Sequence, residues 1–426
     1  MYSDLRPRPD LAAGERNEVL PRGITRPKGF SHVPQSPLGG NKARSTCPRA
    51  RRQFVFDRHS VSCHTAKQGE PFSGGDQLNT PFGYMLAPNI TPDPDTGIGR
   101  WSADDFYRSL HDGVNRRGQD MYPTMPYDFY TNVTREDVDA IYAYLRTLKP
   151  VKNAIDVNHL RFPFDLRWSM AVWRELYFAA GTYRPDAAKS VAWNRGAYLV
   201  EGLGHCADCH SPRNLLGGIE KSKDFAGGPV DGWFAPDLTS DIVTGLRDWT
   251  VDEIATFLKT GAIKGKTPAA FGPMAEVVQN STSYLTDADL NAMAEYLKSI
   301  PPESRLRTGL KTPDPTRQEG VKLYLEYCRD CHQAKGRGLS GIIPPLADNG
   351  TVNASDPVDI IKIVLSGTQR GDNLRIPMPS FETYLNDQQI ADIVNYVRTS
   401  WGNKAVPDVT TSMVAKLRQT SSGGAR

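Results

Sequence analysis

Hydrophobic residues recur at helical spacing in three stretches of the chain, residues 134–148, 286–300 and 386–398. In the first stretch, Val138 and Ile141 represent the face that we expect to be buried. Each stretch also begins with a hydroxyl or amide residue that is followed, three positions later, by an acid or an amide. This pattern is that of a helix N-terminal capping box, or close to it. The residues that mark the three starts are Thr134, Thr286 and Asn386.

Shorter sequences return at a fixed interval. Residues 87–91 (Ala-Pro-Asn-Ile-Thr) reappear 148 positions later as residues 235–239 (Ala-Pro-Asp-Leu-Thr). Trp101 and Trp249 share that interval, and each stands at the start of a predicted helix. The chain is therefore predicted to contain three copies of one unit, in an all-α fold that is rich in loops and has short helices.

The repeats predict three domains, at residues 59–150, 190–302 and 316–402. Residues 151–189 form an aromatic-rich segment between the first two domains, and its helical spacing favours packing between them. We expect a proline-rich linker at 303–315 and a polar tail without an apolar face at 403–426. Residues 1–58 are rich in Pro, Gly and Arg, and we interpret them as disordered or as a mis-assigned N-terminal segment.

Composition describes a soluble globular protein, with 39% hydrophobic and 23% charged residues. A formal net charge of +3 is close to balance, so nothing favours a nucleic-acid partner. Residues 1–45 contain no apolar run of the signal-peptide kind. No other stretch is long and apolar enough to cross a membrane.

Two five-residue motifs carry the chemistry. Residues 206–210 and 328–332 both read Cys-x-x-Cys-His, the attachment sequence of c-type haem. Cys206 and Cys209 can each bond one vinyl group of a porphyrin, as can Cys328 and Cys331, and His210 and His332 then bind the iron. A zinc site would need cysteine pairs closer in sequence. A thioredoxin-like pair needs no trailing histidine.

A third, incomplete motif ends at Cys63 and His64, where Ser60 replaces the first cysteine. Taken alone, it reads as a Cys-His pair in a loop, but the repeat places it where a haem motif belongs. The sequence thus predicts two haem c groups and leaves a third open. That haem would attach through Cys63 alone or not at all.

We expect each copy to have a methionine in a loop beside proline, downstream of its histidine. These residues are Met125, Met274 and Met378, at 61, 64 and 46 positions after His64, His210 and His332. Methionine is the usual sixth iron ligand in cytochromes that transfer electrons, and it raises the reduction potential. A fully coordinated iron argues for electron transfer and against catalysis. We therefore predict the ligand pairs His64/Met125, His210/Met274 and His332/Met378 and no catalytic residue.

From about Val61 to Gly402, the chain resembles the triple-haem cytochrome c subunits of bacterial membrane-bound dehydrogenases. The most specific matches, besides the two complete haem motifs, are residues 87–93, 97–101 and 122–127. The resemblance implies three tandem class I cytochrome c domains. It also implies a large flavin- or pyrroloquinoline quinone-dependent dehydrogenase subunit as partner and ubiquinone as acceptor. It allows a small third subunit in the complex. The expected location is the periplasmic face of the bacterial cytoplasmic membrane.

The sequence departs from that family at its beginning, which lacks a signal peptide and a first-domain helix ending in two cysteines. Two other functions stay open at this stage. One is a soluble or oxidase-associated electron carrier. The other is a multihaem peroxidase, against which the three methionines argue because that reaction needs a vacant or displaceable ligand.

Overall fold

The computed structural model describes residues 60–263, 270–302, 317–340, 342–368 and 376–423 of the 426-residue chain. The chain divides into two units, Met1–Ser45 and Thr46–Arg426, and every described residue belongs to the second. The expected N-terminal segment 1–58 and the expected linker 303–315 lie outside the described residues.

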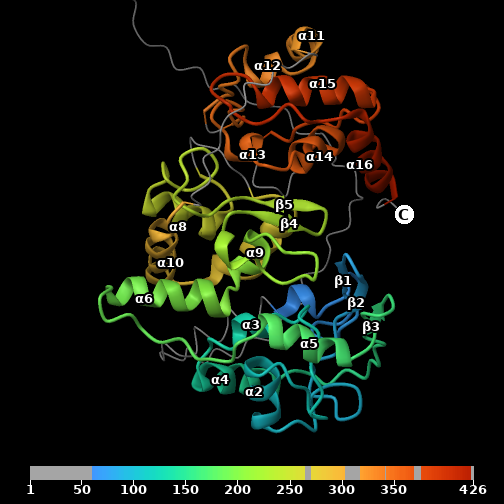
Figure 1. The fold of residues 1–426 in the computed structure, drawn as a ribbon, viewed down its shortest axis with the longest axis vertical. Helices are drawn as coiled ribbons and strands as arrows, with labels where there is room; N and C mark the ends of the chain where they lie inside the picture. The colour runs from blue at the N-terminus through green and yellow to red at the C-terminus, as the bar shows by residue number, and fades with distance from the viewer. Residues whose placement is uncertain (1–59, 264–269, 303–316, 341, 369–375, 424–426) are drawn as a thin grey trace, which may run out of the picture. The chain divides into compact units, whose positions relative to one another are not determined.

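Short helices joined by long loops make up most of the described chain (Figure 1). Residues 60–63 are helical. From there to residue 189 the elements are β1 (Gln77–Thr80), β2 (Gly83–Leu86), α2 (Ala103–His111), α3 (Tyr127–Tyr130), α4 (Arg135–Leu145), β3 (Asn158–Leu160) and α5 (Trp168–Tyr177). Between residues 190 and 302 they are α6 (Val191–Tyr198), η1 (Leu199–Leu203), α7 (Cys206–His210), η2 (Lys221–Lys223), β4 (Gly228–Val230), β5 (Trp233–Ala235), α8 (Val251–Thr260), α9 (Gly272–Asn280), η3 (Thr282–Tyr284) and α10 (Asp287–Ser299). The last part contains α11 (Arg317–Tyr327), α12 (Arg329–His332), α13 (Gly350–Asn353), α14 (Val358–Ser366), α15 (Asp387–Arg398) and α16 (Thr411–Gly423).

Two small antiparallel sheets accompany the helices, although the sequence predicted an all-α fold. One has the strand order β1-β2-β3, with Thr80 opposite Gly83 at its first turn. The other pairs β4 with β5, with Val230 opposite Trp233. Each strand has only three or four residues, which is too short for alternating polarity to be recognised in the sequence. The helix-rich character itself is confirmed.

The three helices expected from hydrophobic spacing are α4, α10 and α15, and each begins where its cap predicts. The side chains of Thr134, Thr286 and Asn386 accept hydrogen bonds from the backbone N–H groups of Asp137, Asp289 and Gln389, respectively. Such caps satisfy N–H groups that have no partner inside the helix. Local sequence therefore fixes these helix starts.

The repeat that includes residues 87–91 and 235–239 extends to the backbone geometry. Phe72 and Phe225 both have a φ of 63°, a left-handed conformation that is uncommon for aromatic residues. The carbonyl of Phe72 accepts a hydrogen bond from Ile90 N–H, and the carbonyl of Phe225 accepts one from Leu238 N–H. The two copies thus share an unusual loop, which extends their likeness beyond the sequence.

Two helix pairs approach each other closely at a glycine, α6 with α10 and α11 with α15 (Figure 1). A Cβ atom on Gly196 in α6 would lie 1.9 Å from the carbonyl oxygen of Ala292 in α10. At Gly320 in α11 it would lie 2.4 Å from the carbonyl oxygen of Asp392 in α15. Both distances are far below a van der Waals contact, so only glycine permits these crossings. Because α6 precedes the first cysteine pair and α11 precedes the second, each crossing holds in place the helix before one pair.

Hydrophobic side chains form two main cores. The first joins buried residues of α2, α4, α6, α8 and α10, and therefore spans the first two predicted domains. The second joins buried residues of α11, α14, α15 and α16. Between them, Asp359 Oδ1 in α14 accepts a hydrogen bond from Phe234 N–H at 2.8 Å, and Lys362 lies over the Trp233 ring.

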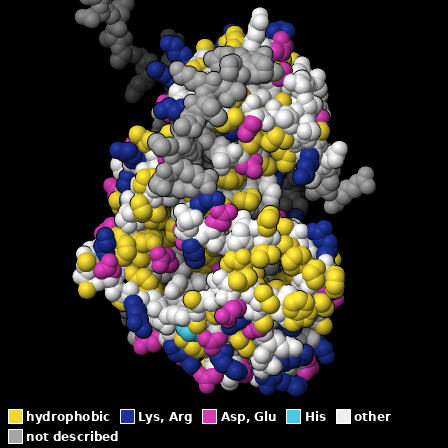
Figure 2. Space-filling model, in the orientation of Figure 1, with side chains coloured by type: hydrophobic (Ala, Val, Ile, Leu, Met, Phe, Trp, Pro, Cys, Tyr) yellow, Lys and Arg dark blue, Asp and Glu magenta, His cyan; other side chains and the backbone are white. Residues whose placement is uncertain are grey.

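The aromatic segment between the first two predicted domains is buried on one side only. Met170 and Trp173 of α5 are buried, and Trp173 Nε1 donates to the carbonyl oxygen of Leu216 at 3.2 Å. This side contacts Tyr127, from before the segment, and Leu216, from after it. On the other side Trp168, Val172 and Leu176 are 64%, 53% and 59% exposed. Figure 2 shows hydrophobic side chains gathered over the region of α5.

The expectation of a polar tail at 403–426 is wrong. Thr411–Gly423 form α16, in which Val414 is fully buried in the second core. The connection before this helix is tied to α15, because Asn395 exchanges two hydrogen bonds of 3.0 Å with the backbone of Val409. The apolar face of α16 is narrow, so hydrophobic spacing alone did not reveal it.

We predict that Gly196→Ala and Gly320→Ala each lower the free energy of unfolding by about 1–3 kcal/mol, since overpacking forces the helices apart. This loss exceeds the gain of roughly 1 kcal/mol that alanine brings to a helix interior. Urea unfolding followed by circular dichroism measures the change. Gly181→Ala is the control, because no atom lies within 4 Å of its added Cβ. Unchanged stability in both helix variants would contradict the close crossings.

Candidate haem centres

The complete motif at Cys206 lies on one helical turn. Cys206 and Cys209 belong to α7, which ends at His210, and both thiols are free. Burial raises the pKa of each thiol to about 12, so both are neutral at neutral pH. Residues three apart in a helix project from the same face. One planar ring can therefore contact both sulfur atoms.

The motif at Cys328 has the same arrangement. The N–H of His332, the last residue of α12, donates to the carbonyl oxygen of Cys328 at 2.9 Å. Cys328 and Cys331 are free, and burial raises the pKa of the Cys328 thiol to about 12. Both complete motifs thus present two thiols and a histidine from a single turn.

The incomplete motif adopts this geometry as well. His64 N–H donates to the carbonyl oxygen of Ser60 at 2.9 Å, which is the bond that His332 makes to Cys328. Ser60 therefore takes the place of a first cysteine, and Cys63 takes the place of the second. Burial is the main cause that raises the pKa of the Cys63 thiol to about 11, and the negative charges of Asp76 and Asp208 contribute to this rise.

All three histidine rings make one common hydrogen bond. Nδ1 lies 2.8 Å from the carbonyl oxygen of Pro88 in His64, 2.7 Å from that of Pro236 in His210 and 3.0 Å from that of Pro344 in His332. A carbonyl oxygen only accepts, so Nδ1 must carry the proton and Nε2 keeps its lone pair. Burial lowers the pKa of each ring, which also favours this neutral form. The three rings are thus prepared to bind a metal through Nε2.

A second common bond fixes the backbone of each histidine. The carbonyl oxygens of His64, His210 and His332 accept hydrogen bonds of 2.8, 2.9 and 3.0 Å from glycine N–H groups. The donors are Gly74, Gly227 and Gly338. Ring and backbone are therefore both held in all three copies. Sequence patterns identified the histidines but not these partners, because the intervals to proline and glycine differ between copies.

The three methionines are partly buried at the edges of the cores. Met125 follows a turn in which its N–H donates to the carbonyl oxygen of Tyr122 at 3.1 Å. Met378 N–H donates to Thr368 Oγ1 at 2.7 Å, and the carbonyl oxygen of Met378 accepts from Thr368 N–H at 2.9 Å. Met274 lies in the first turn of α9, not in the loop that we expected. The pairing of each methionine with its histidine remains a prediction.

The first two centres lie close together. Asn280 Nδ2 in α9 donates to Ser62 Oγ, beside Cys63, at 2.8 Å. Tyr130 packs edge-on against the ring of His205, which precedes Cys206, with centroids 5.4 Å apart. Because these partners are far apart in sequence, no local pattern could reveal their proximity.

A buried acid, Asp128, lies near both centres and was also missed. It belongs to α3, directly after the Met125 turn, and it interacts electrostatically with the negative charge of Asp208 in α7. Burial, followed by the Asp208 charge, raises the Asp128 pKa to about 7. The Oδ1 atom of Asp128 is buried without a hydrogen-bond partner among the described residues. A sizeable fraction of this carboxyl group is therefore protonated at neutral pH.

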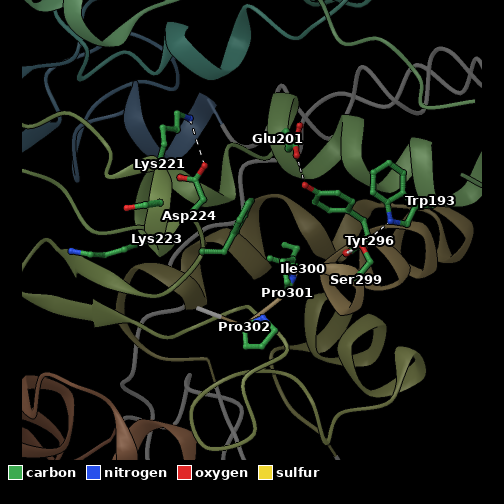
Figure 3. A pocket seen from close by; sticks show the side chains of 12 residues that line it. Trp193, Glu201, Lys221, Lys223, Asp224, Tyr296, Ser299, Ile300, Pro301 and Pro302 are labelled. Atoms are coloured by element: carbon green, nitrogen blue, oxygen red, sulfur yellow. Dashed lines mark hydrogen bonds and ion pairs between the residues drawn. The ribbon is translucent and has the colours of Figure 1, made fainter. Parts of the chain in front are cut away.

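A separate polar cavity of about 490 Å³ lies beside α6 and α10 (Figure 3). Its charged residues have partners, since Tyr296 donates to Glu201, and Lys221 lies 3.7 Å from Asp224. Trp193 Nε1 donates to Ser299 Oγ at 2.7 Å on its rim. None of the cysteines, histidines or methionines of the three centres lines this cavity.

The donors in the three centres suit haem c. Free thiols on a helical turn can form thioethers, and a neutral imidazole with a fixed Nε2 is the usual proximal ligand. Within the described ranges, no three His, Cys, Asp or Glu side chains form a group that could hold a metal ion. The cysteines and histidines predicted from the sequence lie on three turns, and two of these turns have both cysteines.

Comparison with known proteins agrees with this chemistry. The cytochrome c family matches residues 318–401. The cytochrome c subunit of a quinone alcohol dehydrogenase from Gluconacetobacter polyoxogenes is 39% identical over 387 residues, covering 84% of this chain and 81% of that protein. The cytochrome c subunit of gluconate 2-dehydrogenase from Pantoea cypripedii is 38% identical over 383 residues, covering 84% and 86%.

A third relative is organised differently. One of the subunits of nicotinate dehydrogenase from Pseudomonas putida is 37% identical over 373 residues, which cover 86% of this chain but 31% of that protein. The identity over most of the chain, in relatives that this chain largely covers, establishes its family. The chain belongs to the cytochrome c subunits of dehydrogenases.

Proposed function

We propose that this chain is the electron-transferring subunit of a membrane-bound dehydrogenase and consists of three tandem class I cytochrome c domains. The observation that carries the proposal is the histidine-to-proline hydrogen bond, which occurs with the same geometry in all three copies. One such bond has many explanations, but three at matching positions favour one repeated cofactor site. Haem c supplies a one-electron ferric/ferrous couple when bound.

The roles of the residues follow from their chemistry. The thioether bonds would be formed by Cys206 and Cys209, and likewise by Cys328 and Cys331. His64, His210 and His332 would bind iron through Nε2, while their proline partners keep Nδ1 protonated and so fix the ring orientation. A second iron ligand, a thioether sulfur, would come from Met125, Met274 and Met378.

The donor of the electrons is a large partner subunit that contains flavin or pyrroloquinoline quinone. The names of the relatives support this, because they are cytochrome subunits of alcohol, gluconate and fructose dehydrogenases. The complex can also include a small third subunit. Ubiquinone is the proposed acceptor, and the periplasmic face of the cytoplasmic membrane is the proposed location. In the part of the chain that the structure describes, no helix has the length and apolar character needed to span a membrane.

We predict that Met274→Ala lowers the reduction potential of one haem by a tenth of a volt or more. The physical reason is that the thioether favours ferrous iron, and axial ligands shift haem potentials over a range of about 0.8 V. Spectroelectrochemical titration of the purified protein measures the change. Met293→Leu is the matched control, since Met293 is a buried core residue of the same domain. Equal potentials in the Met274 variant and the wild type would exclude Met274 as a ligand.

We further predict that the chain copurifies with a large dehydrogenase subunit and that adding its substrate without oxygen reduces the haems. A ubiquinone analogue should then reoxidise them, as an absorbance decrease at the ferrous α-band would report. A soluble carrier would purify alone, and a peroxidase would consume hydrogen peroxide with a reduced donor. Either result would contradict the proposed role.

A further inference from the structure

The first haem centre offers one thiol where the other two offer two. Ser60 stands four residues before His64 and makes the backbone hydrogen bond that Cys328 makes in the third centre. In the second centre, Cys206 has the same spacing from His210 on one continuous helical turn. The serine hydroxyl is therefore at the position of the first sulfur atom. An alcohol oxygen does not form the bond that a cysteine sulfur forms with a porphyrin vinyl group.

Everything else that a haem centre needs from this turn is present. Cys63 is a free thiol next to His64, as Cys209 is next to His210. The His64 ring donates to Pro88, and its carbonyl oxygen accepts from Gly74, as in both other centres. Ser62, between Ser60 and Cys63, is tied to Asn280 and so faces a different group. The turn thus keeps its shape despite the missing sulfur.

We propose that Cys63 holds the first haem through a single thioether bond, an inference that rests on the proposed electron-transfer function. The Cys63 S–H adds across one vinyl group of the porphyrin. A bond forms between sulfur and one vinyl carbon, and the thiol hydrogen goes to the other carbon. No group leaves and no net oxidation occurs, so the attachment needs no further reactant.

The second vinyl group of this haem stays unreacted beside Ser60. A vinyl group is conjugated with the porphyrin, whereas a thioether-bearing carbon is saturated. The ferrous α-band of the first haem therefore lies at longer wavelength than those of the other two. This spectral difference is independent of any activity of the protein.

The first test is the covalent haem content of the protein purified from its native membranes. Trypsin cleaves after Arg58 and Lys67, so Cys63 lies in the peptide of residues 59–67. Mass spectrometry after iodoacetamide treatment should find haem on this peptide and no alkylated Cys63. Haem on the Cys206 and Cys328 peptides, with Cys63 alkylated, would overturn the inference alone. Haem on none of the three would overturn the proposed function as well.

Variants produced with the haem c maturation apparatus locate the bond. Cys63→Ser should reduce the covalent haem count from three to two, with one haem extracted by acidified butanone. Ser60→Cys should leave the count at three and shift the longer-wavelength pyridine haemochrome band to the position of the other two. An alkylated thiol at position 60 of this variant, with an unshifted band, would contradict the assigned role of Ser60.

A matched control tests the position of the added thiol. Ser62→Cys places a thiol on the same turn, but on the side that faces Asn280. Its haem spectrum should not change, and the added thiol should be alkylated. A band shift in this variant equal to that of Ser60→Cys would contradict the assignment of the second vinyl group to Ser60.

Discussion

The hydrogen bond from histidine Nδ1 to a proline carbonyl oxygen sets the geometry on which each proposed haem centre depends. It closes a loop of 24 residues from His64, 26 from His210 and 12 from His332. The first two loops contain the hairpins β1–β2 and β4–β5, and the third is short. This difference accounts for most of the shorter interval from His332 to Met378, 46 residues against 61 and 64. A shortened loop therefore changes the surface around the third centre while its ring orientation is kept.

The arrangement of the cores has a consequence for electron transfer. The first two proposed centres share one hydrophobic core. Asn280 donates to Ser62 beside Cys63, and Tyr130 packs against His205 beside Cys206. Two sites built into one close-packed core keep a constant separation. The third centre has a core of its own, with polar contacts to the β4–β5 hairpin from Asp359 and Lys362. Burial raises the pKa of Asp359 to about 6, so part of that contact weakens when the carboxyl group is protonated.

Much of the fold and of the candidate centres could be predicted because the signals are local. A capping residue and the first turn of its helix, as at Asn386, lie within four positions. The same holds for two cysteines and a histidine on one turn. Partners set by the tertiary fold could not be predicted. Pro344 lies 12 residues after His332, whereas Pro88 lies 24 residues after His64. The raised pKa of Asp128 depends on burial and on the charge of Asp208, which the tertiary fold brings near it. The helix α16 was missed because its apolar face is narrow, and because the connection before it is held to α15 by Asn395, a polar residue in a buried helix face.

The most direct test of three haem centres with histidine and methionine ligands is a count of such haems by near-infrared magnetic circular dichroism of the oxidised protein. A methionine sulfur bound opposite an imidazole gives ferric haem a charge-transfer band whose intensity is proportional to the number of such haems. We expect an intensity that corresponds to three per chain. An intensity for fewer than three, or bands of high-spin or bis-histidine haem, would contradict three histidine–methionine centres built on the histidine-to-proline hydrogen bond.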